Sequence, residues 1–443
     1  MRTLIYAWGS RGDVQPYLAL ARALNRAGHD AVLAGPERFA GLAQEHGVEF
    51  HPRDQGLLDF YVQDEDISEW LRDQGAVRRG KMALRKRALN KLAGEFFRRF
   101  PRMLADISSA GERGADLVVQ SYEELPFEQG HHVAEKLGAP VVLATLFPNY
   151  VPSAHYPAKF LPADRTFPRV LRRLSHLPGA LLPPIGKAGV DAWRSDVLGL
   201  PARRNQHDRL RRPDGGRVPV LHGFSPHLVP PAPDWPAWVF TTGFWFLPPR
   251  ADYSPPAELA AFLDGGEPPV CVTLGTVRGM DPVEAGRLVV EAVRLAGVRA
   301  VVVRASGSLE VADPPPGVLV VDDVPYPWLF PRTAAVVSAA GVGTVNEALR
   351  VGVPQVTCPV HNEQLMWAVL ARDAGVAGEP LRNRDLTPAR LADAIRAVLA
   401  DRSTGDRARA LARVVDAERG AENAVELLER LHARRDKLTA PVR

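Results

Sequence analysis

Two glycine-containing segments bring together groups that could bind a ligand or move a proton. The first, residues 9–13 (Gly-Ser-Arg-Gly-Asp), lies between an apolar run at 3–8 and a helical pattern at 16–27. Such a loop stands at the carboxyl end of a strand, where open α/β sheets bind ligands, and its glycines allow close approach to the backbone. Asp13 could cap the helix, rest against the positive end of its dipole, or act as a general base toward a hydroxyl. A single aspartate at a helix start favours capping.

The second segment, residues 338–344 with the sequence SAAGVGT, follows a short apolar run and opens another helical pattern. The backbone N–H groups at such a helix start, together with the positive end of the helix dipole, suit a phosphate. Thr344 and Glu347 stand three positions apart and also fit a capping box, so an ordinary helix start is the alternative.

Both segments depend on strands and helices to hold them. Apolar runs that fit strands occur at 3–8, 31–34, 117–120, 140–145, 270–274, 299–304, 318–321, 334–337 and 355–359. Helical patterns alternate with these runs, for example at 282–296 and 344–351. This alternation predicts two α/β halves in tandem, each built on a parallel, doubly wound sheet. Prolines crowd between 201 and 254, which is typical of a linker.

The composition is that of an ordinary globular protein. The chain has 443 residues, 46% hydrophobic and 24% charged, and its net charge of +4 is too small to favour a nucleic-acid partner. Cys271 and Cys358 lie in apolar, strand-like runs, so we expect neither a disulfide nor a cysteine metal site. The start lacks a signal-peptide pattern and no stretch of about 18 apolar residues is present, so we expect a cytoplasmic protein.

Six segments, in order along nearly the whole chain, carry a resemblance to a known family. They are 9–16 (GSRGDVQP), 234–236 (DWP), 242–247 (TGFWFL), 324–332 (VPYPWLFPR), 352–355 (GVPQ) and 363–368 (EQLMWA). Together they resemble the bacterial antibiotic and sterol-type glycosyltransferases of the GT-B fold. The resemblance implies two Rossmann-like domains that face each other across a cleft. One would bind a nucleotide sugar, and the other a small, fairly apolar acceptor.

The resemblance also implies how the chain is divided. The N-terminal, acceptor-binding domain would cover 1–225, and the linker 226–255. The C-terminal, nucleotide-sugar-binding domain would cover 256–420. A last helix within 421–443 would pack back on the N-terminal domain.

Roles for individual residues follow from the same resemblance. Asp13 would be the general base that deprotonates the acceptor hydroxyl, whose attack would invert the anomeric carbon. The loop residues near the diphosphate and the acceptor would be Gly9, Ser10 and Gly12. No metal and no further cofactor are implied, because a helix terminus takes the place of a metal and the nucleotide-diphosphate sugar is itself a substrate.

The implied donor-binding residues all lie in the second half of the chain. Val324 would pair with the nucleotide base through its backbone, and Glu347 would bind the ribose. Glu363 and Gln364 would hold hydroxyls of the donor sugar. The residues implied at the diphosphate, with Arg304 near the base or the phosphates, are Thr276, Gly341, Gly343, Thr344 and Arg304.

One position departs from the family. Where the family carries a histidine that hydrogen-bonds the diphosphate, this chain has Ala339. Losing such a donor costs on the order of 1.5–3 kcal/mol, which weakens donor binding without forbidding it, because the helix N-terminus remains. Two other interpretations therefore stay open: a GT-B enzyme with an atypical donor or an epimerase activity, and a non-catalytic helper protein. The oligomeric state stays open too.

Two charged segments admit more than one interpretation. The segment 78–102, from Arg78 to Arg102, holds ten Lys or Arg residues and one acidic residue. One helical face of this region carries Leu89, Leu92, Phe96, Phe100 and Met103. A solvated basic face over the domain core is expected, and weak contact with a membrane surface is the alternative. The run Asp64-Glu65-Asp66 matches a metal signature of another glycosyltransferase fold, but its polar surroundings favour solvent exposure, so no metal is expected.

Overall fold

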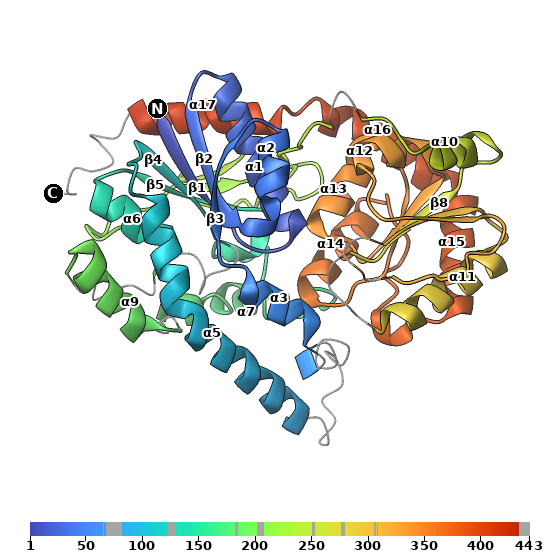
Figure 1. Cartoon of the computed structure of the whole chain (residues 1–443), viewed down its shortest axis with the longest axis horizontal. Coiled ribbons are helices and arrows are strands. Elements are labelled where there is room, and N and C mark those ends of the chain that lie inside the picture. Colours follow the sequence, from blue (N-terminus) through green and yellow to red (C-terminus); the bar gives the residue numbers. More distant parts are fainter. Residues whose placement is uncertain are drawn as a thin grey trace.

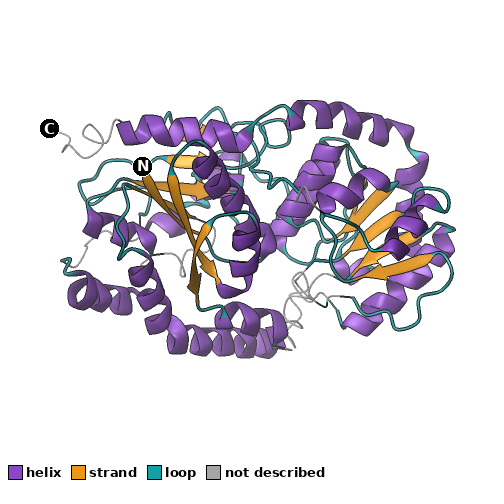
Figure 2. Cartoon of the chain, turned by 45° about the horizontal axis from the view of Figure 1, so that its top comes forward, coloured by secondary structure: helices purple, strands orange, loops and turns teal. Residues whose placement is uncertain are grey.

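The computed structural model describes residues 1–64, 66–67, 82–122, 129–181, 185–201, 208–249, 253–275, 280–304, 307 and 309–433. Within these residues the chain forms two α/β halves, each with a sheet of parallel strands between helices (Figures 1 and 2). The expected class, two parallel-sheet α/β domains, is thereby confirmed. No helix in the described part of the chain is long and apolar enough to cross a membrane.

The first sheet has seven strands in the order β3-β2-β1-β4-β5-β6-β7, all paired in parallel. They are β1 (Arg2–Tyr6), β2 (Asp30–Pro36), β3 (Glu49–Arg53), β4 (Leu117–Ser121), β5 (Val141–Thr145), β6 (Val220–His222) and β7 (Val239–Thr241). The strand order reverses between β1 and β4. Such a reversal opens a crevice at the carboxyl ends of the strands, where doubly wound sheets bind ligands.

The second sheet has five parallel strands in the order β10-β9-β8-β11-β12. They are β8 (Val270–Thr273), β9 (Ala300–Val303), β10 (Val318–Val321), β11 (Ala335–Ser338) and β12 (Gln355–Thr357). Here the order reverses between β8 and β11. The segment that follows β11 therefore stands at the ligand-binding crevice of this sheet.

Helices connect the strands and cover the sheets. Those of the first half are α1 (Arg11–Arg26), α2 (Ala40–Glu45), α3 (Gly56–Gln63), α5 (Met82–Ala110), α6 (Gly130–Leu137), α7 (Arg169–Leu174), α8 (Leu177–Leu181) and α9 (Lys187–Trp193). Those that follow are α10 (Ala257–Asp264), α11 (Pro282–Ala296), α12 (Tyr326–Leu329), α13 (Val342–Val351), α14 (Asn362–Asp373), α15 (Pro388–Ala400), α16 (Arg402–Asp416) and α17 (Gly420–Ala433).

Both faces of each sheet are buried. In β1, Leu4 belongs to one hydrophobic core and Ile5 to another, because successive side chains point to opposite faces. In β8, Cys271 and Val272 divide in the same way. This two-sided burial explains why the strands appear in the sequence as continuous apolar runs. The core that holds Ile5 also includes Trp367 of α14, so the two halves share packed side chains.

The chain crosses between the halves twice. Strand β7 lies inside the range 226–255 that was expected to be a linker, and it forms the edge of the first sheet before the chain crosses. The last helix, α17, returns and packs against α1 (Figure 1). At that contact the His29 Nε2 atom lies 2.8 Å from a carboxylate oxygen of Glu429. A closing helix thus ties the end of the chain to its beginning.

His222, at the end of β6, predicts a pH dependence of stability. Its ring is buried, stacks on Phe224 with centroids 4.6 Å apart, and meets Trp235 edge-on. Burial lowers the pKa of His222 from 6.5 to about 3. Between these values the unfolded chain binds a proton that the folded chain excludes, so we expect stability to be lost as pH falls from 6.5 toward 3.

Urea unfolding at a series of pH values measures this effect. His222→Gln should show a shallower loss of unfolding free energy across that window than the parent protein. His227→Gln is the control, because the His227 side chain is 44% exposed and its ring lies 3.9 Å from the carboxylate of Glu418, so it should change the slope less than His222→Gln does. Equal slopes for His222→Gln and the parent would contradict the assignment.

Candidate functional site

The first glycine loop, residues 9–13, leads from β1 into α1 at the reversal point of the first sheet. Ser10 is the N-cap residue, and its backbone N–H and its hydroxyl both donate to Asp13 Oδ2 at 2.8 Å. The N-cap role expected for Asp13 is therefore wrong: Ser10 is the N-cap residue, and Asp13 completes the capping box from the third position of the helix. The same two hydrogen bonds fix the orientation of this half-buried carboxylate at the edge between the two halves.

Gly9 permits the backbone conformation of this loop, and Gly12 permits its close contact with the other half. Gly9 has φ +127°, and a Cβ atom there would lie 2.7 Å from Asp13 Oδ2. Gly12 faces the other half of the molecule: a Cβ atom on Gly343 would lie 3.5 Å from the Gly12 Cα atom. The two glycine-containing segments of the sequence therefore meet backbone to backbone.

The second glycine loop, residues 338–344, leads from β11 into α13 at the reversal point of the second sheet. Ala340 takes φ 60°, in the left-handed region, and its N–H donates to Ser338 Oγ at 3.1 Å. Gly341 is the N-cap residue of α13 and has no side chain that could occupy the first N–H groups of that helix. Such groups suit an anion. Ala339 is buried and brings no polar side-chain atom to the loop.

Glu347 lies in the second turn of α13 and is buried. Its carboxylate accepts hydrogen bonds from Arg350, one of them from Nε at 3.1 Å, and Arg350 also pairs with Asp416 of α16. Burial raises the pKa of Glu347, although Arg350 opposes the shift. The capping-box alternative for Thr344 and Glu347 is wrong, because α13 already begins at Val342 and the Glu347 side chain is bonded to Arg350.

The residues expected near the nucleotide base lie in different environments. Val324 is buried, and it follows β10 after a short loop. Arg304, at the end of β9, has its Nη1 atom 3.4 Å from Asp322 Oδ1. Thr276 lies outside the described residues. The structure therefore brings Arg304 and Val324 to the carboxyl edge of the second sheet, after β9 and β10, and β8 separates these strands from β11 and the second glycine loop.

Arg11 links the two halves at this edge, although from the sequence only the loop that contains it was singled out and Arg11 itself was assigned no role. Its Nη1 atom lies 3.2 and 3.3 Å from the two carboxylate oxygens of Asp323, the residue before Val324. Both side chains are largely exposed. Nearby, the buried Tyr326 hydroxyl lies 2.8 Å from Thr273 Oγ1, and burial raises the pKa of Tyr326 to about 12. A guanidinium group thus stands between the first glycine loop and the start of α12.

Glu363 and Gln364 open α14 and face the first half. The Tyr150 hydroxyl donates to Glu363 Oε1 at 3.3 Å, and the Lys159 Nζ atom lies 3.7 Å from the same oxygen. Lys159 also donates to the Tyr150 hydroxyl at 3.1 Å. Gln364 is buried, and its Oε1 atom accepts the N–H of Val360 at 2.8 Å. Glu363, the first residue of the pair expected to hold the donor sugar, therefore contacts the side chains of Tyr150 and Lys159 in the first half.

Aromatic side chains line the first half beside this contact. The rings of Tyr122 and Tyr150 are 5.5 Å apart, those of Phe147 and Tyr150 are 6.2 Å apart, and Phe147 reaches Trp367 of α14 at 6.0 Å. Tyr122, Phe147 and Tyr150 follow the carboxyl ends of β4 and β5. Sequence reasoning missed them, because each is an isolated aromatic residue after a strand, with no motif around it.

Two buried polar atoms accompany these rings. The Ser121 Oγ atom and the Asn149 Oδ1 atom are inaccessible to solvent and have no hydrogen-bond partner among the described residues. Buried polar atoms usually have a partner, so each marks a place where a ligand hydroxyl or a water molecule can bind.

The acidic run that resembles a metal signature is paired with α5. The side chains of Asp64 and Asp66 are 13% and 14% exposed, and Lys91 pairs with both, at 3.2 Å from Asp64. The expectation of a solvent-exposed run is wrong for these two residues, because side chains of α5 at the protein surface cover their carboxylates. Glu65 lies outside the described residues. Among the described residues no group of three or more His, Cys, Asp or Glu side chains is placed to hold a metal ion.

The described part of the basic segment forms the first turns of α5. Its aromatic side chains Phe96 and Phe100 are buried in a core of the first half, while Leu89 is exposed. Several of its cations are paired with carboxylates: Lys91 with Asp64, Arg99 with Asp54 and Glu95, and Arg102 with Asp54. Much of its positive charge is thus neutralised within the protein.

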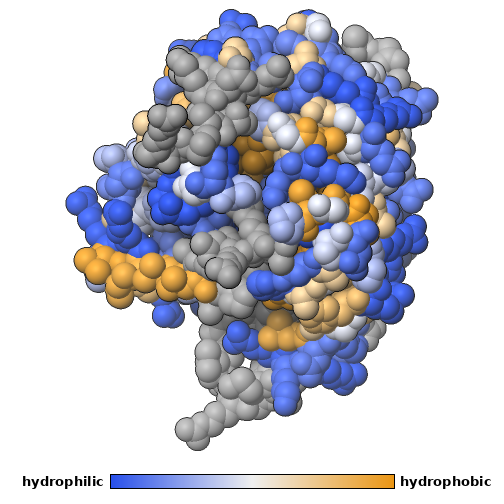
Figure 3. Space-filling model, turned by 90° about the vertical axis from the view of Figure 1, so that its left-hand side faces the viewer, coloured by the Kyte–Doolittle hydropathy of each residue, from blue (hydrophilic) through white to orange (hydrophobic). Residues whose placement is uncertain are grey.

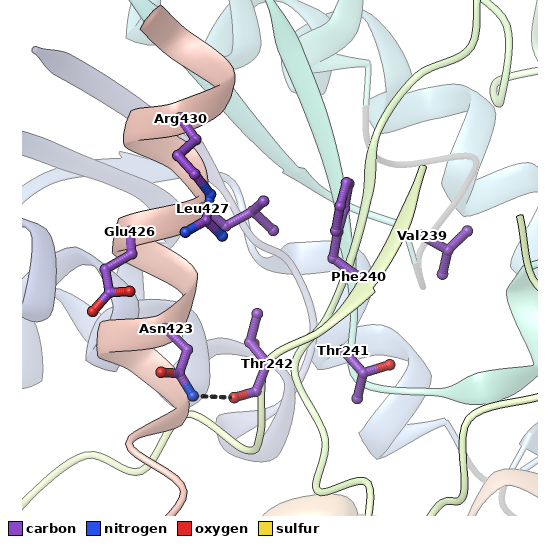
Figure 4. A pocket seen from close by; sticks show the side chains of 8 residues that line it. All are labelled: Val239, Phe240, Thr241, Thr242, Asn423, Glu426, Leu427 and Arg430. Carbon is purple, nitrogen blue, oxygen red and sulfur yellow. Dashed lines mark hydrogen bonds between the residues drawn. The ribbon is translucent and has the colours of Figure 1, made fainter. Parts of the chain in front are cut away.

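A pocket lies where the chain crosses between the halves (Figure 4). It is lined by β7, the residue after it, and α17, and one of its walls is held by Asn423, whose Nδ2 donates to the Thr242 carbonyl at 3.0 Å. No residue expected in the site from the sequence lines this pocket. Its lining residues are Val239, Phe240, Thr241, Thr242, Asn423, Glu426, Leu427 and Arg430.

Comparison with known proteins gives two family matches. Residues 3–156 match the glycosyltransferase family 28 N-terminal domain, and residues 287–431 match the erythromycin biosynthesis protein CIII-like C-terminal domain. The chain is 34% identical to O-mycaminosyltylonolide 6-deoxyallosyltransferase of Streptomyces fradiae, over 97% of both chains. It is 30% identical to sterol 3-beta-glucosyltransferase of Leptosphaeria maculans over 83% of this chain, but it spans only 24% of that longer relative.

Solved structures share the whole architecture. A calicheamicin glycosyltransferase aligns with a TM-score of 0.66 and 20% identity, over 98% of this chain and 99% of the other. The glycosyltransferase VinC, solved in complex with DTDP, aligns with a TM-score of 0.63 and 21% identity, over 98% of this chain and all of the other. The two sheets therefore have the GT-B arrangement expected from the sequence.

Gly9 generates a prediction about the first glycine loop. We expect Gly9→Ala to lower the free energy of unfolding by about 1–3 kcal/mol, because a side chain rarely adopts this backbone conformation and would overlap the Asp13 carboxylate. Gly12→Ala is the matched control, since its Cβ would lie 3.5 Å from Val342 in ordinary contact. Urea unfolding compares the variants, and equal stability of the two would show that Gly9 has no special conformational role.

Proposed function

This chain belongs to the GT-B glycosyltransferases, and we propose that it transfers a sugar from a nucleoside-diphosphate sugar to a hydroxyl of a small, largely apolar acceptor, with inversion. The observation that carries the proposal is the meeting of the two glycine loops. It sets the oriented carboxylate of Asp13 opposite the uncapped N-terminus of α13. A proton acceptor and an anion-binding helix start are the two parts that such a transfer requires.

The donor is expected on the second half. The N–H groups of residues Gly341, Gly343 and Thr344 would bind the diphosphate, and the positive end of α13 would stabilise the charge that builds up there. The positive end of α13 would stabilise the negative charge of the diphosphate, as a metal ion does in other transferases. Thr276 and Arg304 would stand beside the phosphates or the base.

The remaining donor contacts follow the same edge of the sheet. The Val324 backbone would pair with the base, and Glu347, kept in place by Arg350, would accept hydrogen bonds from the ribose. Glu363 and Gln364 would hold hydroxyls of the sugar. That VinC was solved with DTDP supports a thymidine or related nucleotide as the first donor to examine.

The acceptor is expected on the first half, between Asp13 and the aromatic side chains Tyr122, Phe147 and Tyr150. An apolar, ring-containing acceptor would pack on these rings, and Ser121 and Asn149 offer polar atoms to its hydroxyl groups. The names of the relatives support this class, since one acts on an O-mycaminosyltylonolide and another on a sterol.

The reaction is a single displacement. Asp13 takes the proton from the acceptor hydroxyl while its oxygen forms a bond to the anomeric carbon. The bond from that carbon to the phosphate oxygen breaks, and the nucleoside diphosphate leaves with the electron pair toward α13. Because the nucleophile enters opposite the leaving group, the anomeric carbon is inverted.

Arg11 is the group that we propose as a substitute for the family's diphosphate-binding histidine, whose position is Ala339 in this chain. It lies next to Gly12, which faces Gly343 of the second glycine loop, and its present partner is the exposed carboxylate of Asp323. An exposed ion pair of this kind contributes only about 0–1 kcal/mol, so a diphosphate can replace Asp323 as the partner of the guanidinium.

Asp13→Asn tests the proposal as a whole. With a thymidine-diphosphate sugar and an apolar hydroxyl acceptor, the parent protein should form the glycoside, and the variant should turn over at least about 10²-fold more slowly. Affinity for the nucleoside diphosphate should stay unchanged. Normal turnover in a folded variant would leave Asp13 as a cap alone.

Product analysis of the parent separates the rival interpretations. An epimerase would change the donor sugar without any acceptor, and a non-catalytic helper would leave the donor unchanged. A transferase consumes the donor at a rate that depends on the acceptor. A rate of donor consumption that is the same with and without the acceptor would contradict the proposed sugar transfer.

Arg11→Gln tests the proposed substitute for the histidine. We expect it to weaken binding of thymidine diphosphate about 10-fold or more, the effect of removing a charge-assisted hydrogen bond, and to leave thymidine itself unaffected. In an Ala339→His background the effect should be smaller, because the imidazole then also binds the diphosphate. Isothermal titration calorimetry measures both.

The matched control is Asp323→Asn. If Arg11 only joins the two halves, removing its partner should weaken nucleotide binding as much as removing Arg11. If Arg11 binds the diphosphate, Asp323→Asn should leave the affinity unchanged or raise it, since it releases the guanidinium.

A further inference from the structure

One segment of the first half turns its apolar side chains outward. Thirteen large hydrophobic side chains are exposed in the described part of the chain, and seven of them fall between residues 160 and 185. They are Phe160, Val170, Leu171, Leu174, Leu177, Leu181 and Ile185, at 46% to 68% exposure. We call these seven side chains the apolar surface. An exposed cluster of this kind on a protein usually marks a binding surface.

The polar side chains of Arg172 and of the turn between α7 and α8 face the protein. Ser175 is buried, donates to the Arg172 carbonyl and accepts the N–H of Ala158 at 2.9 Å. His176 Nε2 lies 2.9 Å from the Tyr156 carbonyl oxygen, and Arg172 donates to the carbonyl oxygens of Phe167 and His155. The polar residues thus bind the protein, and the leucines face outward.

The apolar residues also follow one helical face. Val170, Leu174, Leu177 and Leu181 are spaced by four, three and four positions, which is the repeat of a single stripe across α7 and α8. A surface helix normally buries such a stripe. Figure 3 views the side of the molecule where α9 lies and shows a ridge of hydrophobic residues that projects from a mainly hydrophilic face.

The charge around this stripe is mainly positive. The sequence from 164 to 191 contains four arginines and one lysine against two carboxylates, Asp164 and Asp191, which pair with Arg382 and Lys187. Arg165, Arg169 and Arg173 are exposed, and only Arg173 lies near a carboxylate among the described residues, at 3.7 Å from Asp234. The segment continues into α9, which packs on α5, because Gly186 and Gly189 lie against the Phe100 ring.

We propose that the apolar surface of α7 and α8 docks on the surface of an anionic lipid bilayer. The leucine stripe would enter the boundary between headgroups and acyl chains, and Arg165 and Arg169 would bind the lipid phosphates. This combination, an outward apolar face with exposed arginines beside it, is what an interfacial helix requires. It places the membrane contact on α7 and α8 rather than on the paired cations of α5.

The charge pattern argues against a second copy of this chain as the occupant. A two-fold dimer on this surface would bring the same arginines of both copies together, and the two carboxylates that flank the segment, Asp164 and Asp191, already pair with Arg382 and Lys187. A bilayer that contains anionic lipid would bury the apolar side chains and would also pair the arginines with lipid phosphates.

Vesicle co-sedimentation tests the proposal with the full-length protein. Binding should be strong to vesicles that mix phosphatidylcholine with phosphatidylglycerol and weak to phosphatidylcholine alone. Arg165→Gln/Arg169→Gln should lower the partition coefficient about 10-fold or more, because each cation near such a surface contributes to the binding. Val170→Ser/Leu174→Ser/Leu177→Ser should lower it at least as much. All five side chains are exposed, so the variants should fold.

The matched control exchanges exposed apolar residues of the second half. Val283→Ser/Leu295→Ser/Val414→Ser removes similar side chains elsewhere and should bind vesicles like the parent. Parent protein that fails to bind the anionic vesicles would overturn the proposal. So would serine variants that keep vesicle binding but convert a dimer to a monomer, or that only raise the KM for an acceptor, since these results would assign the surface to a second copy or to the acceptor.

Discussion

The first turns of α1 and α13 approach each other through glycine backbone, and most of the arrangement around the site depends on this approach. Gly12 and Gly343 leave room for only a methyl group between the two loops. Each loop stands at the reversal point of a parallel sheet, so the ligand-binding edges of the two sheets face each other. Two helix N-termini with positive ends repel, and Asp13, bonded to Ser10, places a negative carboxylate at one of them. The same carboxylate therefore holds the loop and stands where a hydroxyl can be deprotonated.

The parts of the structure that depend on local pattern could be predicted from the sequence. Continuous apolar runs indicated both parallel sheets, because strands buried on two faces must be apolar at every position. The glycine loops lie where the strand–loop–helix order put them. The local pattern at Thr344 and Glu347 gave a wrong prediction, because two residues three positions apart fit a capping box as well as positions inside a helix. The structure decides between the two, since α13 begins at Val342, two residues before Thr344.

The contacts between the halves could not be predicted, since no local signal encodes them. Arg11 meets Asp323 across more than three hundred residues, and Tyr150 meets Glu363 across more than two hundred. Asp64 and Asp66 appeared solvent-exposed in the sequence because their partner Lys91 lies on a helix whose placement no local pattern reveals. The outward leucines of α7 and α8 have the spacing of an ordinary amphipathic helix, and only the exposed fractions of their side chains show that they face outward.

The exchange proposed for Arg11 connects the binding of the donor to the closing of the two halves. The guanidinium joins the halves by pairing with Asp323, and Asn362 joins them again by donating to the carbonyl oxygens of Lys159 and Leu161. The ion pair between Arg11 and Asp323 is exposed and weak. The hydrogen bonds of Asn362 are made to backbone carbonyl groups, so they can break and form again. A diphosphate at α13 would give Arg11 a stronger partner of the same geometry, also on the second half. The halves would then stay together with the donor in place, and Arg11 would return to Asp323 when the nucleotide leaves.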